Sequence, residues 1–141
     1  MVYTAQSASK HSMRMFTEVG RRVPAHATGV GKATLAQLDD RQIHRIITRA
    51  GMPAMTERTI TDPEEFLAEM APLRERGYAI DDGEQEVGVR SVSMAIAQAP
   101  APTAVSISGP AARLPEDTVE QVVPELMRTA RVLSELYAAE G

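Results

Sequence analysis

Residues 28–32, Thr-Gly-Val-Gly-Lys, combine the residue types that can hold an anion. A threonine that caps a helix precedes backbone N–H groups without intrahelical acceptors, and these groups carry partial positive charge. The glycines allow close approach to the backbone, and Lys32 adds a cation. The spacing is not that of a phosphate-binding loop, which needs two glycines five positions apart and then Lys-Ser/Thr. An ordinary helix cap, with glycines for close packing, fits the same residues.

Two pairs of serines recur at a spacing of two, Ser91 with Ser93 and Ser106 with Ser108. Side chains two positions apart in a strand point to the same side. Each pair can therefore line a polar pocket on one face of a sheet. The same pattern is typical of the solvent-exposed face of a half-buried sheet, so both interpretations stay open.

Four acidic residues cluster between the serine pairs and the preceding helix, at Asp81, Asp82, Glu84 and Glu86. Metal binding, general-base chemistry and a plain polar turn all fit, and the turn composition favours the last. The three histidines lack metal-ligand spacing, and a G-x-S-x-G elbow is absent from the sequence. We therefore predict no metal, no cofactor and no enzymatic activity.

The elements that position these residues follow from periodicity and caps. Spacing of two predicts short strands, at residues 2–6, 14–19, 78–80, 87–96 and 104–108. Cap residues and spacings of three and four predict helices, at residues 29–38, 40–50, 63–76 and 117–138. Prolines lie inside two of them, so we expect a kink or an early end at Pro72 and a bend at Pro124. Clustered strands with a hairpin predict one α+β domain, residues 1–141, on an antiparallel sheet.

Composition excludes several classes of protein. The 141 residues include no cysteine, which excludes a disulfide scaffold, a thiol nucleophile and a Cys-ligated metal site. The net charge of −4, with 15 basic residues spread along the chain, is unsuited to nonspecific nucleic-acid binding. Neither a signal peptide nor an apolar run of about 20 residues is recognisable. We expect a cytoplasmic protein without membrane contact.

Six blocks of the sequence together resemble one protein family. They are RMFTEVGRRVP at 14–24, HATGVGK at 26–32, GMP…T…TI at 51–60, RERGYA at 74–79, DDGE…GVR at 81–90 and SISGP at 106–110. In this order, and over nearly the whole chain, they resemble the IclR family of bacterial transcription regulators. The resemblance covers the C-terminal effector-binding domain, which implies a GAF-like curved antiparallel sheet with flanking helices. The N-terminal winged helix-turn-helix, and the start of the effector domain, look absent.

The resemblance also implies a ligand site. Its residues are the backbone groups of Gly29 and Val30, followed by Asp81, Val89, Ser91, Ser106 and Ser108. The helix start would hold an anionic group, the serines would donate to its oxygens, Val89 would form an apolar wall and Asp81 would accept from a ligand hydroxyl or orient its neighbours. The chain departs from the family where Ser91 replaces a frequent Cys, Ser93 and Ala95 replace Ala and Pro, and Ala25 replaces Leu. Serine at 91 makes this wall more polar.

Three hypotheses follow. The first is a ligand-sensing domain that binds a small-molecule effector, a carboxylate, and thereby alters homodimer or homotetramer assembly. DNA would be bound only through the N-terminal domain that looks absent. The second is an oligomerisation module without a usable ligand site, because a missing first segment would expose a sheet edge and an apolar helix face. The third is an enzyme such as an acid-metabolising hydrolase.

Overall fold

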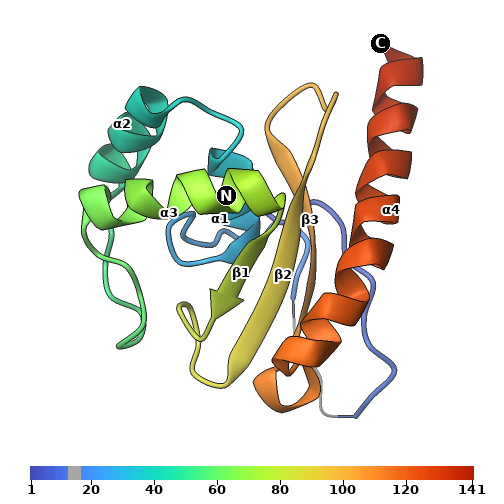
Figure 1. Cartoon of the computed structure of the whole chain (residues 1–141), viewed down its shortest axis with the longest axis horizontal. Helices are drawn as coiled ribbons and strands as arrows, with labels where there is room; N and C mark the ends of the chain where they lie inside the picture. The colour runs from blue at the N-terminus through green and yellow to red at the C-terminus, as the bar shows by residue number, and fades with distance from the viewer. Residues whose placement is uncertain (13–16) are drawn as a thin grey trace.

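The computed structural model describes residues 1–12 and 17–141. A three-stranded antiparallel sheet, in the order β1-β2-β3, lies at its centre (Figure 1). The strands are β1 (Ala79–Asp82), β2 (Val89–Ile96) and β3 (Thr103–Pro110). The helices are α1 (Gly29–Leu35), α2 (Asp40–Ala50), α3 (Pro63–Arg76) and α4 (Glu116–Glu140), with a short 3-10 turn, η1 (Ala111–Arg113), before α4. Helices and an antiparallel sheet confirm the α+β class.

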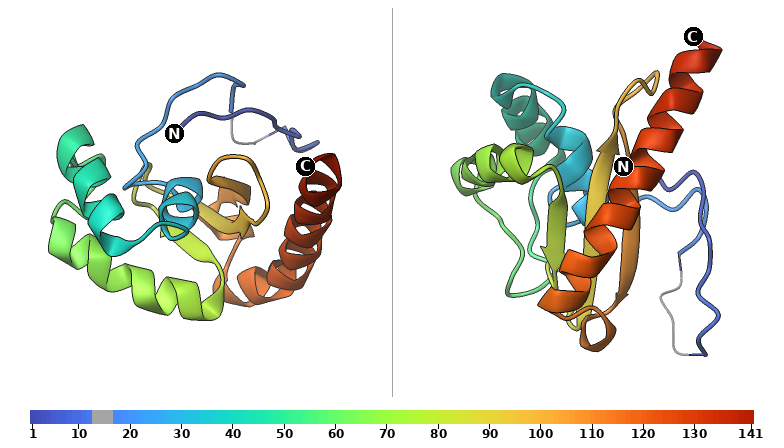
Figure 2. Two further views of the ribbon diagram at one scale, coloured as in Figure 1. Left: turned by 90° about the horizontal axis from the view of Figure 1, so that it is seen from above. Right: turned by 45° about the vertical axis from the view of Figure 1, so that its right-hand side comes forward.

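Helices cover both faces of the sheet. Figure 2 shows α4 on one side of the sheet and α1, backed by α2 and α3, on the other. The α4 side is an aliphatic core that contains Val92, Met94 and Leu126. The α1 side is a second core, centred on Phe66 and Ile43. Burial on both faces fixes the register of the strands, because a slip of one residue would exchange the two faces.

Local signals set the helix ends, as predicted. Asp39 and Gln42 form a reciprocal capping box at the start of α2. Asp62 caps α3 with Pro63 in the first turn, and Gly77 ends α3 in the left-handed conformation that glycine tolerates. The described residues include no helix of the length and hydropathy that a membrane span requires.

The predicted strand at residues 2–6 is wrong in extent. The only bridge assigned there among the described residues joins Val2 to Arg22, supported by backbone bonds from Tyr3 N to Arg21 O (3.1 Å) and from Val23 N to Met1 O (3.0 Å). Beyond Tyr3 the segment has no strand partner in the described part of the chain. Residues 14–16 of the strand predicted at 14–19 lie outside the described residues, and residues 17–19 form no strand.

Other boundaries shift by a few residues. Helix α1 ends at Leu35 rather than 38, and α4 extends by one residue at its start and two at its end. Strand β2 begins at Val89 rather than 87, β1 continues through the acidic pair Asp81 and Asp82, and β3 continues to Pro110. Strands β2 and β3 pair continuously from Val89–Pro110 to Ile96–Thr103. This backbone pairing extends β3 through Gly109 and Pro110, where the sequence predicts a turn.

The two internal prolines do not interrupt their helices. An early end of α3 at Pro72 is wrong, since α3 continues to Arg76. Phe66, Met70 and Leu73 pack into one core on both sides of this exposed proline, and that packing keeps the turns in line. Helix α4 continues through Pro124 and changes direction in its N-terminal part (Figure 1).

Candidate functional site

The two faces of the sheet differ in chemistry. On the α4 face β2 and β3 present aliphatic side chains, including Val92, Val105 and Ile107. The opposite face presents small and polar side chains, which we call the serine face; its residues are Ala79, Asp81, Val89, Ser91, Ser93, Ser106 and Ser108. Strand register places them side by side. Such a surface packs poorly as an apolar core and is suited to polar recognition.

Helix α1 lies directly over the serine face. Thr28 caps it by accepting from the Gly31 amide at 3.1 Å, and the Thr28 hydroxyl donates to the Pro24 carbonyl at 2.9 Å. A side chain at Gly29 would start 2.5 Å from Ser93 Oγ and 2.6 Å from Ser91 Oγ. Glycine at 29 thus lets the helix backbone approach the two serines closely.

Gly31 supports this placement from the other side, and its replacement is a direct test. A Cβ at this position would overlap the backbone of Ala25, which cannot swing away as a side chain can. We expect Gly31→Ala to lower the free energy of unfolding by about 1–3 kcal/mol through overpacking. Urea unfolding measures this. Thr34→Ala on the same helix should stay within about 0.5 kcal/mol of wild type, and equal stability of the two variants would contradict the described packing.

The serines form two rows across the strands. Ser91 pairs with Asp81 on β1 and Ser108 on β3, and Ser93 pairs with Ala79 and Ser106. Ser91 and Ser93 are buried, Ser106 is half-buried and Ser108 is exposed. The hydroxyls of Ser106 and Ser108 are 3.4 Å apart. A solvated sheet face therefore describes Ser108 but not the β2 pair.

Ser93 carries the most informative atom of the face. Its side chain is fully buried, and its hydroxyl has no hydrogen-bond partner among the described residues. Burying a hydroxyl without a partner is unfavourable, and native structures rarely leave one unpaired without a reason. The orphaned oxygen lies against the backbone of Gly29 at the start of α1.

Asp81 is the buried acid of the serine face. Burial raises the pKa of its carboxyl group from 3.8 to about 6, whereas a hydrogen bond from the Glu84 amide to Asp81 Oδ1, 2.8 Å long, opposes the rise. The Glu84 charge raises the pKa further and the Lys32 charge lowers it. Burial likewise raises the pKa of the Tyr3 hydroxyl; Arg21 opposes that rise, and Asp81 adds to it. This pKa of Asp81 lies in the pH range in which histidine side chains usually change charge.

Lys32 does not supply the cation expected at the helix start. Its Nζ is 2.8 Å from Glu84 Oε2 and 3.4 Å from Glu69 Oε2, and its side chain is 3% exposed. The plain polar turn expected for the acidic cluster is also wrong in part. Glu84 is buried in this ion pair, and Asp82 pairs with Arg58 and Arg90. The described residues contain no cluster of potential metal ligands.

The structure brings together four of the predicted site residues, Gly29, Asp81, Ser91 and Ser108. Gly29 meets Ser91, and Ser91 lies beside Asp81. Ser106 and Ser108 follow on the next strand, and Val89 lies at the end of the face, opposite Pro110. Val30 is buried in the first turn of α1. The membership of these seven residues in a ligand site stays a prediction.

Two features of the site were missed. The predicted set does not include Ser93, although its spacing from Ser91 places it on the same face. The partnership of Lys32 with Glu84 joins residues 52 positions apart and has no signal in local sequence. Among the histidines, His26 is buried with its Nε2 2.9 Å from the Pro53 carbonyl, a structural contact.

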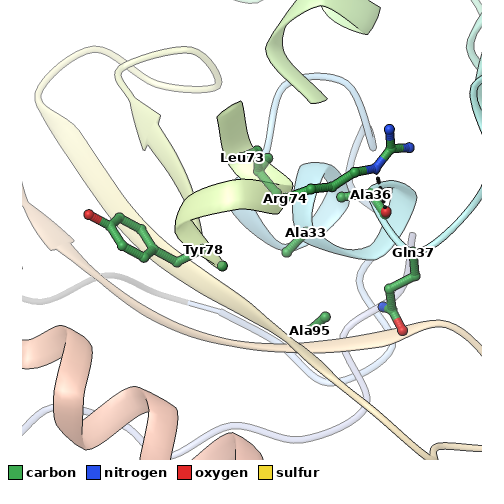
Figure 3. A pocket seen from close by; sticks show the side chains of 8 residues that line it. Ala33, Ala36, Gln37, Leu73, Arg74, Tyr78 and Ala95 are labelled. Carbon is green, nitrogen blue, oxygen red and sulfur yellow. Dashed lines mark hydrogen bonds between the residues drawn. The ribbon is translucent and has the colours of Figure 1, made fainter. Parts of the chain in front are cut away.

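A separate cavity of about 160 Å³ lies between the end of α1, the end of α3 and β2 (Figure 3). Its walls include Ala33, Leu73, Tyr78 and Ala95. Arg74 lines it as well, but its guanidinium already donates to the carbonyls of residues 36 and 38 and to Asp40. This cavity therefore offers no uncommitted arginine for an anion, in contrast to the donors of the serine face.

Comparison with known proteins places the chain in a family. The profile of the family described as "Bacterial transcriptional regulator IclR C-terminal" matches residues 1–135. The chain is 35% identical over 129 residues to the transcriptional repressor IclR of Escherichia coli (strain K12), which covers 90% of this chain and 47% of that protein. The chain spans about half the length of the curated relatives it matches.

Solved structures of related regulators have a similar fold. The Thermotoga maritima IclR matches with a TM-score of 0.83 and 30% identity, over 91% of this chain and 53% of that one. The inducer-binding domain of the PobR transcription factor from Acinetobacter, a double mutant in complex with 3-hydroxybenzoic acid, matches with a TM-score of 0.77 and 31% identity. It covers 84% of this chain and 70% of that one.

Proposed function

Because this chain belongs to the IclR family of bacterial transcriptional regulators, where it matches the C-terminal domain, we propose that it is an effector-sensing domain. Its effector is a small organic anion bound between α1 and the serine face. The observation that carries the proposal is the buried Ser93 hydroxyl, which has no partner among the described residues and lies against Gly29. A carboxylate oxygen would satisfy it after displacing the first turn of α1, because Gly29 packs against this hydroxyl.

Each predicted site residue has a role in this proposal. The first amides of α1, at Gly29 and Val30, have no intrahelical acceptor and donate to the effector carboxylate. Ser91, Ser106 and Ser108 donate from the sheet. Asp81 accepts from an effector hydroxyl, and Val89 forms the apolar wall at the end of the face. The 3-hydroxybenzoic acid held by the similar PobR domain carries both a carboxyl and a hydroxyl group, which supports an effector of this chemistry.

Sensing requires that binding alter something beyond the site. We propose that the effector favours one homo-oligomeric arrangement of the regulator over another, and that DNA binding by a region outside this chain follows that arrangement. A preference of a few kcal/mol between the two arrangements is sufficient. The regulator acts in the cytoplasm, where its DNA is, and the site carries out no enzymatic step.

A thermal-shift screen tests the proposal. The panel is glyoxylate, pyruvate, short dicarboxylates and hydroxybenzoates, including 3-hydroxybenzoate. A ligand at a hundredfold excess over its dissociation constant stabilises the native state by about 2.7 kcal/mol, which raises Tm by several degrees in a domain of this size. No stabilisation by any carboxylate at millimolar concentration would contradict an anion-sensing role.

The Ser93→Ala variant tests whether the ligand binds at the serine face. Removing an unpaired buried hydroxyl should leave the Tm of the free protein unchanged or higher, while the ligand-induced rise in Tm falls by half or more. A purely structural serine would show the reverse, a lower Tm and an intact ligand response. Ser134→Ala on α4, where the hydroxyl donates to the Ala130 carbonyl at 2.8 Å, is the matched control and should retain the full response.

A second candidate is an oligomerisation module without a ligand. It is favoured by three exposed apolar side chains of α4, Met127, Val132 and Leu136, since exposed apolar surface promotes association. Light scattering decides it. A mass equal to the monomer across micromolar concentrations would exclude this candidate, whereas a stable oligomer indifferent to every carboxylate would favour it over sensing.

A further inference from the structure

The buried ion pair between Lys32 and Glu84 lies next to the proposed effector site but outside its predicted ligands. Lys32 Nζ contacts both carboxylate oxygens of Glu84, at 2.8 and 3.0 Å. Both side chains are almost inaccessible, 3% and 10% exposed. Burying two charges is costly and contributes little net stability on average. Such a pair calls for a role beyond holding the fold together.

We propose that Lys32 and Glu84 are positioning residues of the effector site: their ion pair fixes the turn after β1, holds the Asp81 carboxyl group in one orientation and controls its charge. The link to effector binding rests on the proposed function. The effect on Asp81 itself does not, and it is measurable without a ligand.

The geometry connects the pair to Asp81 through one residue. The same Glu84 whose carboxylate binds Lys32 donates its backbone amide to Asp81 Oδ1 at 2.8 Å. The Glu84 carbonyl accepts from the Thr59 hydroxyl, and the Thr56 hydroxyl donates to the Gly83 carbonyl at 2.6 Å. The turn is therefore anchored at both its side chain and its backbone, and Asp81 Oδ1 has a fixed donor.

The pair also ties α1 to the turn. Lys32 lies three residues after Gly29 on the same helix, close to one helical turn. Its ion pair with Glu84 and its longer contact with Glu69 on α3 therefore hold α1 over the serine face from two elements. A displacement of either partner would move the Gly29 backbone relative to Ser91 and Ser93.

The charged groups that act on Asp81 come from three elements. Glu84 in the turn raises the pKa of Asp81, Lys32 on α1 lowers it, and Tyr3 in the N-terminal segment lies within electrostatic range. Glu69 on α3 shares Lys32. The neighbouring β2 residue, Ser91, does not titrate in this range. Lys32 and Glu84 thus oppose each other at Asp81.

This opposition gives a signature that a merely structural pair would lack. Carboxyl-detected NMR of the full chain without ligand, with Asp81 assigned through Asp81→Asn, follows the ionisation of Asp81. We expect the titration midpoint to move to lower pH in Glu84→Gln, because a repelling charge is lost. In Lys32→Met it should move to higher pH, because an attracting charge is lost. Glu86→Gln, an exposed acid of the same turn, is the matched control and should not move the midpoint.

Midpoints that stay at the wild-type pH, or that move in the same direction in both variants, would overturn the inference. If one variant fails to fold, the direction seen in the other still decides. The outcome is separable from that of the proposed function. Opposite shifts of Asp81 with no binding of 3-hydroxybenzoate or pyruvate would leave the positioning role and remove the effector. Binding of either probe without shifts would do the reverse.

Discussion

Replacing Lys32 with methionine is expected to lower the free energy of unfolding by about 3–5 kcal/mol, as breaking one side of a buried ion pair generally does. The reason is the partner left behind. Glu84 is 10% exposed and would remain a buried anion without its cation, which is unfavourable unless the turn opens toward water. Domains have about 5–15 kcal/mol of stability in total, so the loss is a large fraction. Urea unfolding measures it.

Two further variants make this prediction specific. Lys32→Met/Glu84→Leu removes both charges and should recover most of the loss, because apolar replacement of a whole buried pair is close to neutral. Arg128→Met breaks the exposed pair with Glu125, whose atoms are 2.8 Å apart, and should cost less than about 1 kcal/mol. A Lys32→Met cost as small as that of Arg128→Met would mean that the Lys32–Glu84 pair is effectively solvated.

The affinity for a carboxylate effector is expected to fall by up to about tenfold for each pH unit above 6, the limiting slope when binding requires a proton on one group. Burial raises the pKa of Asp81 to about 6. Below that pH its carboxyl group is neutral, whereas above it an anionic effector would meet a second anion in a buried site. Calorimetric titration with 3-hydroxybenzoate between pH 5.5 and 8 measures the slope.

The Asp81→Asn variant is the control for both binding and folding. Its affinity should lose this pH dependence, since asparagine keeps the Oδ1 acceptor for the Glu84 amide but does not ionise. The free energy of unfolding also depends on pH, in the same direction as the affinity. A pKa raised from 3.8 to about 6 means that the folded state holds the proton longer, so stability falls as pH rises from about 4 to 6 and stays lower above. Identical pH profiles for wild type and Asp81→Asn would show that Asp81 does not titrate in this range.

Local signals predicted much of the fold and part of the site. The caps at Thr28, Asp39 and Asp62 act within four residues, so the sequence alone located three helix starts. The period of two placed each serine pair on one side of its strand, and the register that pairs Ser91 with Ser108 brings the two pairs onto the same face. Both signals depend only on neighbours along the chain.

Long-range contacts explain what the sequence did not predict. Lys32 looked like a cation offered to a ligand, because its partner Glu84 lies in a different part of the chain. Pro72 predicted a kink or an early end of the helix, because the packing of Leu73 and Met70 around it is tertiary and has no local signal. Ser93 looked secondary to Ser91, and only the approach of Gly29 showed that its hydroxyl is buried and unpaired.

The most direct test of the central claim is amide NMR of this chain titrated with 3-hydroxybenzoate, pyruvate and glyoxylate at pH 5.5. We predict that the largest shift changes occur at Gly29, Ser91 and Ser93, with smaller ones at Ser106, and that Ser93→Ala weakens them. Changes confined to the cavity between α1 and α3, at Ala36 and Leu73, or no changes with any of the three acids, would contradict an anion site on the serine face.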